Sequence, residues 1–136
     1  MQSYYDSQLD VARELFHKTQ YDMTLSILNH ELPKIEAEGN QKALCEYMNL
    51  KIAYLLNKSD VTSVEPLLEK FKYALTASGN KELQVNHLYH SANLFYFSGD
   101  SERSIEYNLK VLEMIGNQHS HPFYLGICIN LISQYL

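Results

Sequence analysis

Histidine is the residue type whose spacing in this chain comes closest to a metal site. His87 and His90 lie one helical turn apart, and His119 and His121 follow in a turn that folding could bring back beside them. Four imidazoles can hold zinc. No cysteine or carboxylate completes the set, however, and polar residues are expected in a turn. We therefore predict no metal site and no cofactor.

The residues that could act in catalysis lack the partners that catalysis needs. Cys45 has no obvious histidine and carboxylate to activate it, and Cys128 lies in one of the most apolar stretches of the chain. Gly99 and Asp100 form a two-residue turn rather than the glycine-rich loop that binds phosphate. The sequence therefore predicts that the chain is not an enzyme.

Composition narrows the class of protein further. The chain has 136 residues, of which 46% are hydrophobic, and this is enough apolar material for the core of one folding unit. Its net charge of −5 argues against binding to nucleic acid, and its apolar runs are too short to span a membrane. The start carries no secretion signal, and the two cysteines look like free, buried thiols, so we expect a cytoplasmic protein.

Helices must position any functional side chain, because helical periodicity runs throughout the chain and no segment alternates as a strand would. Thr62 and Glu65 predict a capping box before the fourth helix, and Pro33 predicts a kink in the second. Short links require neighbouring helices to pack antiparallel. The predicted fold class is therefore all-α. The expected helices cover about residues 4–18, 21–38, 42–57, 63–77, 81–97, 101–115 and 123–136.

Three glycine–asparagine pairs divide the chain into similar units. Gly39-Asn40, Gly79-Asn80 and Gly116-Asn117 recur at two nearly equal spacings, and each pair closes an amphipathic stretch. Self-similarity of this kind is typical of stacked helical hairpins, since no single hairpin can bury its apolar face alone. We predict a single domain over residues 1–136. Its repeats are expected at about residues 4–39, 42–79 and 81–116, with a half repeat at 122–136.

The clearest unit carries small and aromatic residues in a fixed order. Ala92 fills a small slot, Phe95 fills an aromatic slot about one turn later, and Gly99 lies in the turn before the second helix. This order resembles the tetratricopeptide repeat (TPR). The resemblance implies a right-handed superhelix of antiparallel helix pairs, about three repeats and one further helix.

The same order recurs on both sides of this unit. The first two glycine–asparagine pairs are one repeat apart. Going back from Ala92 and Phe95 by that same number of residues leads to Ile52 and Leu55, which therefore take the small and aromatic slots. Isoleucine is large for the small slot. The spacing between the last two pairs, counted forward, places Ile129 and Ile132 on the same two slots. The resemblance therefore covers essentially the whole chain.

The length of the repeat indicates which kind of TPR the chain resembles. The spacings from Gly39 to Gly79 and from Gly79 to Gly116 both exceed the common TPR period of about 34 residues, which indicates longer helices. Such long-helix repeats are similar to those of bacterial regulatory proteins, including peptide-pheromone receptors of Gram-positive bacteria and the sensory halves of GGDEF signalling enzymes. The resemblance implies a module that binds a protein or peptide segment in its concave groove, as the docking or sensory part of a bacterial regulator. The sequence does not identify that partner.

The first helix of each TPR lines this groove, which assigns the residues that would contact a ligand. A side-chain amide can donate to and accept from a peptide unit at once, and tyrosine adds apolar area with a polar tip. Arg13 could meet a ligand carboxylate, although pairing with Asp10 is the favoured interpretation. The groove residues implied by the resemblance include Leu9, Arg13, Asn49, Asn86, Tyr89, His90, Asn93, Tyr96 and Asn130.

The last predicted helix is apolar nearly all round and has no hairpin partner. Three outcomes stay open: the natural chain continues past Leu136, two copies bury these helices against each other, or the helix folds back into the groove. We favour a fragment of a longer protein, whose isolated piece self-associates through Ile129, Ile132 and Leu136. The alternative function is therefore a structural scaffold that forms a homodimer through this helix.

Overall fold

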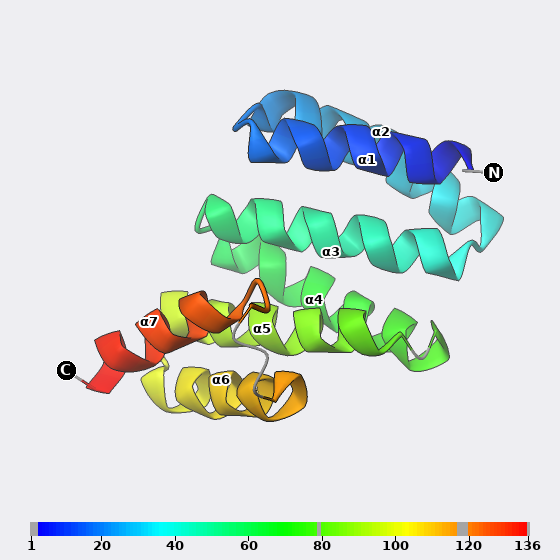
Figure 1. The fold of residues 1–136 in the computed structure, drawn as a ribbon. Coiled ribbons are helices and arrows are strands. Elements are labelled where there is room, and N and C mark those ends of the chain that lie inside the picture. Colours follow the sequence, from blue (N-terminus) through cyan, green and yellow to red (C-terminus); the bar gives the residue numbers. More distant parts are fainter. Residues whose placement is uncertain (1–2, 79, 117–119, 136) are drawn as a thin grey trace.

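The computed structural model describes residues 3–78, 80–116 and 120–135, and this part of the chain folds into seven α-helices with no strand (Figure 1). The predicted all-α class is confirmed, and every helix bound lies within two residues of its predicted position. None of the described helices is both long and apolar enough to cross a membrane. The helices are α1 (Tyr4–His17), α2 (Tyr21–Glu38), α3 (Gln41–Asn57), α4 (Val61–Ser78), α5 (Lys81–Phe97), α6 (Ser101–Ile115) and α7 (Tyr124–Tyr135).

The helices form two layers that alternate along the chain (Figure 1). We call α1, α3, α5 and α7 the first helices and α2, α4 and α6 the second helices. Each helix packs against the next one in the chain, and α3 also contacts α1 and α5. In the described part of the chain, the backbones of the second helices do not approach one another as closely as those of adjacent helices do. Adjacent helices therefore pack as repeats, while the right-handed sense of the superhelix stays a prediction.

The turns inside the three helix pairs are equivalent in position and in conformation. Thr19, Ser59 and Gly99 occupy the same place in successive repeats and all have positive φ, at 60°, 57° and 81°. This left-handed conformation costs a residue with a Cβ roughly 1–2 kcal/mol, which glycine avoids. The chain adopts it at all three turns, where only three residues separate the two helices of a pair.

The starts of the helices repeat in the same way. Asn40 and Asn80 each accept a hydrogen bond from the backbone N–H three residues further on, at 3.2 and 3.0 Å. Asp60 and Asp100 do the same at the starts of α4 and α6, both at 3.2 Å. These side chains satisfy backbone donors that a helix leaves open at its first turn. The repeat period is therefore encoded in local capping as well as in the apolar pattern.

Two local predictions about the helices need comment. The capping box of Thr62 and Glu65 is wrong, because α4 already begins at Val61 and Asp60 supplies the cap. The helix α2 continues through Pro33 as one element, and the kink at this residue stays a prediction. Its ring lies at the surface, where a lost backbone hydrogen bond can be replaced by water.

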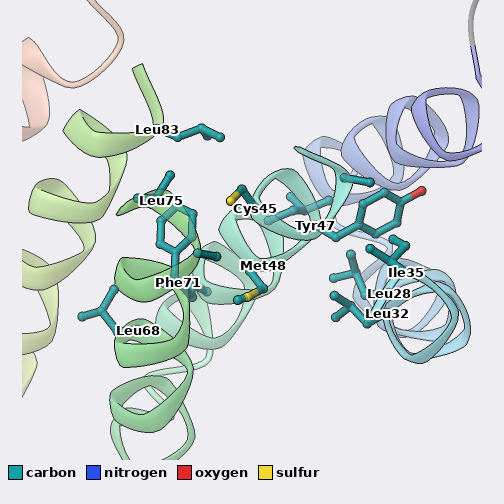
Figure 2. Close-up of a cluster of buried hydrophobic side chains, with 14 of the residues drawn as sticks. Leu28, Leu32, Ile35, Cys45, Tyr47, Met48, Leu68, Phe71, Leu75 and Leu83 are labelled. Atoms are coloured by element: carbon teal, nitrogen blue, oxygen red, sulfur yellow. The ribbon is translucent and has the colours of Figure 1, made fainter. Parts of the chain in front are cut away.

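Most of the apolar core lies between α1 and α5. Figure 2 shows Cys45, Tyr47 and Met48 of α3 beside the buried aliphatic side chains of α2 and Phe71 of α4. A smaller cluster joins α5, α6 and α7. Its buried members are Val85, Val111, Ile115 and Ile127. The larger cluster positions α3, and the smaller one positions α7 relative to α5.

Candidate ligand-binding face

The predicted groove residues lie on the first helices, and α5 carries the central set. Asn86, Tyr89, Asn93 and Tyr96 follow one another at spacings of three and four residues, which places them along one side of α5. We call the surface formed by the groove residues of α1, α3, α5 and α7 the first-helix face. Asn86 is half-buried, and its side chain makes no hydrogen bond to the other described residues.

One polar contact joins α3 to α5. The Nε2 atom of His90 donates to Oδ1 of Asn49 at 2.7 Å. Burial and, to a smaller extent, the neighbouring His87 lower the pKa of His90 to about 3, so the ring is neutral. The neutral ring must then carry its proton on Nε2. His90 and Leu9 were both predicted to face a ligand, and both predictions are wrong. His90 is buried between α3 and α5, and Leu9 is buried on α1.

A second polar contact joins α5 to α7. The Nδ2 atom of Asn130 donates to Oδ1 of Asn93 at 3.2 Å. The backbone carbonyl of Asn130 also accepts a hydrogen bond from Gln134 Nε2 at 3.0 Å. Two of the predicted groove asparagines are therefore brought together. Within the described chain, the amide nitrogen of Asn93 and the amide oxygen of Asn130 make no hydrogen bond.

The two predicted groove tyrosines differ in their surroundings. Tyr89 stacks on Phe123, with ring centres 4.1 Å apart and planes 11° from parallel. A Cβ added to Gly126 would lie 2.6 Å from the Tyr89 hydroxyl oxygen, so α7 approaches this ring closely. Tyr96 is 40% exposed and contacts only the edge of Phe97 among the described aromatic rings. Tyr96 is thus the more accessible of the two.

Arg13 lies on α1, away from the two polar contacts. Its Nη1 atom is 3.8 Å from Oδ1 of Asp10, and both side chains are exposed. An exposed ion pair of this kind contributes about 0–1 kcal/mol to stability. Arg13 therefore pairs with Asp10 as favoured, and its contact with a ligand carboxylate stays a prediction.

The structure also shows where the histidines lie. His121 donates from Nε2 to Oε1 of Glu82 at 3.3 Å, and its Nδ1 accepts from the backbone N–H of Phe123. His87 packs against Phe71, and burial, then the charge of Lys72, lowers its pKa. His119 lies outside the described residues. Among the residues that are described, no group of three His, Cys, Asp or Glu side chains could hold a metal ion.

Clefts open on the other layer, between α2, α3 and α4. One has a volume of about 510 Å³ and is lined by Leu44, Met48 and Tyr73 among others. A neighbouring cleft of about 320 Å³ shares Met48 with it. Sequence reasoning missed this surface, although the signal was present. Tyr73 lies on the solvent side of the apolar pattern of α4, and it is 84% exposed.

A buried carboxylate was also missed. Glu31 of α2 accepts hydrogen bonds from the Tyr4 hydroxyl at 2.8 Å and from His30 Nδ1 at 2.9 Å, both at Oε1. Its Oε2 atom is buried and has no partner in the described part of the chain. Burial acts to raise the pKa of Glu31, but the hydrogen bonds from His30 and Tyr4 outweigh it and lower the pKa. Positions 31, 71 and 111 are equivalent in the repeat. A carboxylate at a position that holds Phe71 and Val111 in the other repeats was the sequence signal that could have revealed the burial of Glu31.

The terminal helix α7 is neither free nor fully covered. Ile127 is completely buried in the smaller cluster, whereas Ile129 and Ile132, predicted to self-associate, are 53% and 59% exposed. Leu136, the third residue of that prediction, lies outside the described residues. One side of α7 therefore packs on α5 and α6, and the other side is open.

No family model, no curated protein and no solved structure matches this chain. The likeness to TPRs therefore depends on the residue pattern alone. Independently of that likeness, the chain is an all-helical protein whose adjacent helices pack as repeated pairs with equivalent turns.

Proposed function

We propose that this chain is a protein-binding helical repeat module, of the TPR type, that takes an extended peptide segment on its first-helix face. We further propose that it works in the cytoplasm, without catalysis or cofactor, as the docking or sensory part of a bacterial regulator. A repeat array suits this role because its stacked helices present one long, nearly continuous surface.

The observation that carries the proposal is the pair of polar contacts between successive first helices. Asn49 meets His90, and Asn93 meets Asn130, so each asparagine is held by a neighbour. An asparagine whose carbonyl is already bonded is oriented in advance, and binding a peptide then costs less side-chain entropy. The Nδ2 groups of Asn49 and Asn93 make no hydrogen bond to other described residues and could donate to peptide carbonyls.

The test begins with selection from a displayed library of random peptides against the full chain. Affinities of the selected peptides should fall at least about tenfold, or about 1.4 kcal/mol, when Asn93→Ala and Asn130→Ala are combined. Helical content should not change, because the two side chains bond to each other and neither is left alone. Asn29→Ala, at an exposed position of the second helix α2, is the matched control. Unaltered affinity in the double variant would refute the assignment of the first-helix face.

A second candidate function is the structural scaffold, a homodimer held through α7. The exposed Ile129 and Ile132 favour it, since neighbouring apolar side chains on one helix commonly mark an interaction site. Light scattering would then give twice the monomer mass for the wild type and the monomer mass for Ile129→Asp, while the peptide-binding variants would have no effect on mass.

A further inference from the structure

The open side of α7 carries a stripe of three large apolar side chains. Leu125, Ile129 and Ile132 are 70%, 53% and 59% exposed. Their spacing of four and then three residues places them along one side of the helix. No residue of α7 is charged, so nothing on the helix screens the stripe from an apolar partner. We call these three residues the α7 stripe.

In the other helix pairs, the positions equivalent to the α7 stripe face the second helix of the pair. In the preceding repeat, the equivalent positions are Leu88, Ala92 and Phe95 of α5. There the hydroxyl of Ser104 donates to the carbonyl of Ala92 at 2.9 Å, and the rings of Tyr107 and Phe95 lie 5.4 Å apart. Both covering residues belong to α6. The equivalent side of α5 is thus covered by its own second helix.

The same register in α3 matches the α7 stripe most closely in chemistry. One repeat further back, the equivalent positions are Met48, Ile52 and Leu55, which are again three large apolar side chains. Met48 and Ile52 are buried, and Leu55 packs against the same cluster. Position 129 therefore holds the same residue type as position 52, which is fully covered in the pair α3–α4.

We propose that the α7 stripe is a docking site for an amphipathic helix of the second-helix type, presented by a partner protein and packed antiparallel to α7. The residues that cover a first helix define the chemistry of that partner. Thr24, Val64 and Ser104 are equivalent and all buried, and Ile27, Leu67 and Tyr107 follow three residues later. The partner helix should therefore carry a small or β-branched residue followed, three positions on, by a large apolar one.

A second copy of this chain fits the site less well. The first helices meet one another through different positions, such as Asn49 with His90 and Asn93 with Asn130. The α7 of another copy is itself a first helix, and its small–large pair, Cys128 and Leu131, is half-buried against its own neighbours. The proposal concerns α7 alone and stands whether or not the first-helix face binds a peptide.

The experiment uses a fluorescent peptide with the sequence of residues 60–78, which contains α4, as the probe of the full chain. Fluorescence anisotropy should show saturable binding, and Ile129→Asp should weaken it at least about tenfold. Ile132→Asp should act in the same direction at a second position. Both positions are more than half exposed, so neither variant should lose helical content by circular dichroism. The matched control is Leu109→Asp, another exposed leucine, on α6.

The possible results of this experiment distinguish a partner helix from a second copy of the chain at the α7 stripe. Binding by a monomeric protein, lost in Ile129→Asp and absent for a peptide with Val64→Asp and Leu67→Asp, would support the proposal. A dimer that Ile129→Asp converts to monomer, and that excludes the peptide, would overturn it in favour of a second copy. Absence of binding, or binding that Ile129→Asp leaves unchanged, would also overturn it.

Discussion

The second helix pair fills its core with hydrocarbon at two positions where the third pair buries polar groups. Positions 28, 68 and 108 are equivalent by the repeat period, and they hold Leu28, Leu68 and Asn108, all buried. Positions 50 and 90 hold Leu50 and His90, again both buried. The backbone of the turns and caps is nearly the same in all three pairs, so the pairs differ mainly in what their cores contain.

This difference teaches that equal geometry does not mean equal stability in a repeat protein. Both polar atoms of the Asn108 side chain are buried without a hydrogen-bond partner among the described residues, whereas the buried carboxylate of Glu31 in the first pair lacks a partner only at Oε2 and accepts two hydrogen bonds at Oε1. An unsatisfied buried polar group costs about 1–3 kcal/mol. Because each repeat contacts only its neighbours, such a cost weakens one part of the array more than the rest. We expect the part around α5, α6 and α7 to open before the part around α1 to α4.

The same substitution at equivalent positions of the first and third pairs should give the largest difference in the free energy of unfolding. Ile35 and Ile115 are equivalent by two periods and both buried, Ile35 in the larger cluster and Ile115 in the smaller. Ile35→Ala should cost about 4–5 kcal/mol of unfolding free energy and Ile115→Ala only about 2–3 kcal/mol, since measured values depend on how well the site is packed. Urea unfolding of both variants measures this, and equal losses would contradict the idea of unequal cores.

Acid should destabilise the protein through His90. Its pKa is about 3 in the folded chain because of burial, against about 6.5 for an unperturbed histidine. The unfolded state therefore binds more protons below about pH 6.5, and stability should fall with decreasing pH at up to about 1.4 kcal/mol per pH unit. The stability is fully present above about pH 6.5 and is lost as the pH falls towards about 3.

The variant His90→Gln isolates this effect. Glutamine can still donate to Asn49 but does not titrate, so its stability should change less between about pH 7 and about pH 4.5 than that of the wild type. Unfolding free energies across this range, measured with urea, make the comparison. Identical pH profiles of the two proteins would show that other groups, such as Glu31 with its lowered pKa, are responsible.

Replacing Asn108 with leucine should make the third pair resemble the first two. The change removes a buried amide that has no partner among the described residues and restores the residue found at positions 28 and 68, so stability should rise by about 1–3 kcal/mol. Amide hydrogen exchange should also slow in α6 and α7. Asn57→Leu, at an exposed position, should change stability by less than about 0.5 kcal/mol. A destabilised Asn108→Leu would mean that the amide has a favourable role.

The smallest expected effect sharpens the comparison at α7. In Gly126→Ala the new Cβ would clash with the Tyr89 hydroxyl, while alanine gains about 1 kcal/mol of helix propensity over glycine. The net change in global stability should be below about 1 kcal/mol, but exchange of the α7 amides should become faster because the helix is pushed away. Adding Tyr89→Phe removes the hydroxyl and should restore slow exchange. Persistent fast exchange in the double variant would argue against this contact.

Much of the fold could be predicted from the sequence because its signals are local. Glycines and asparagines mark the ends of helices, and the apolar spacing gives the helix type and the repeat period. The error at Thr62 is also local, since Asp60 is an equally good capping residue two positions earlier. The alignment of Ile129 with Ala92 predicts that α7 is the first helix of a further repeat, and this stays a prediction.

The sequence by itself determined where the helices lie, how they repeat and that each hairpin needs a neighbour, since backbone propensity and apolar spacing act over a few residues. Only the tertiary structure decided which polar side chains are covered. His90 and Asn108 became buried, and Asn49 and Asn93 acquired partners, while Leu125 stayed exposed. Burial depends on which helix packs against a side chain. The spacing of apolar residues along a helix only loosely constrains which helix packs against which side chain. The solvation and hydrogen bonding of a side chain at the interface depend directly on that packing partner.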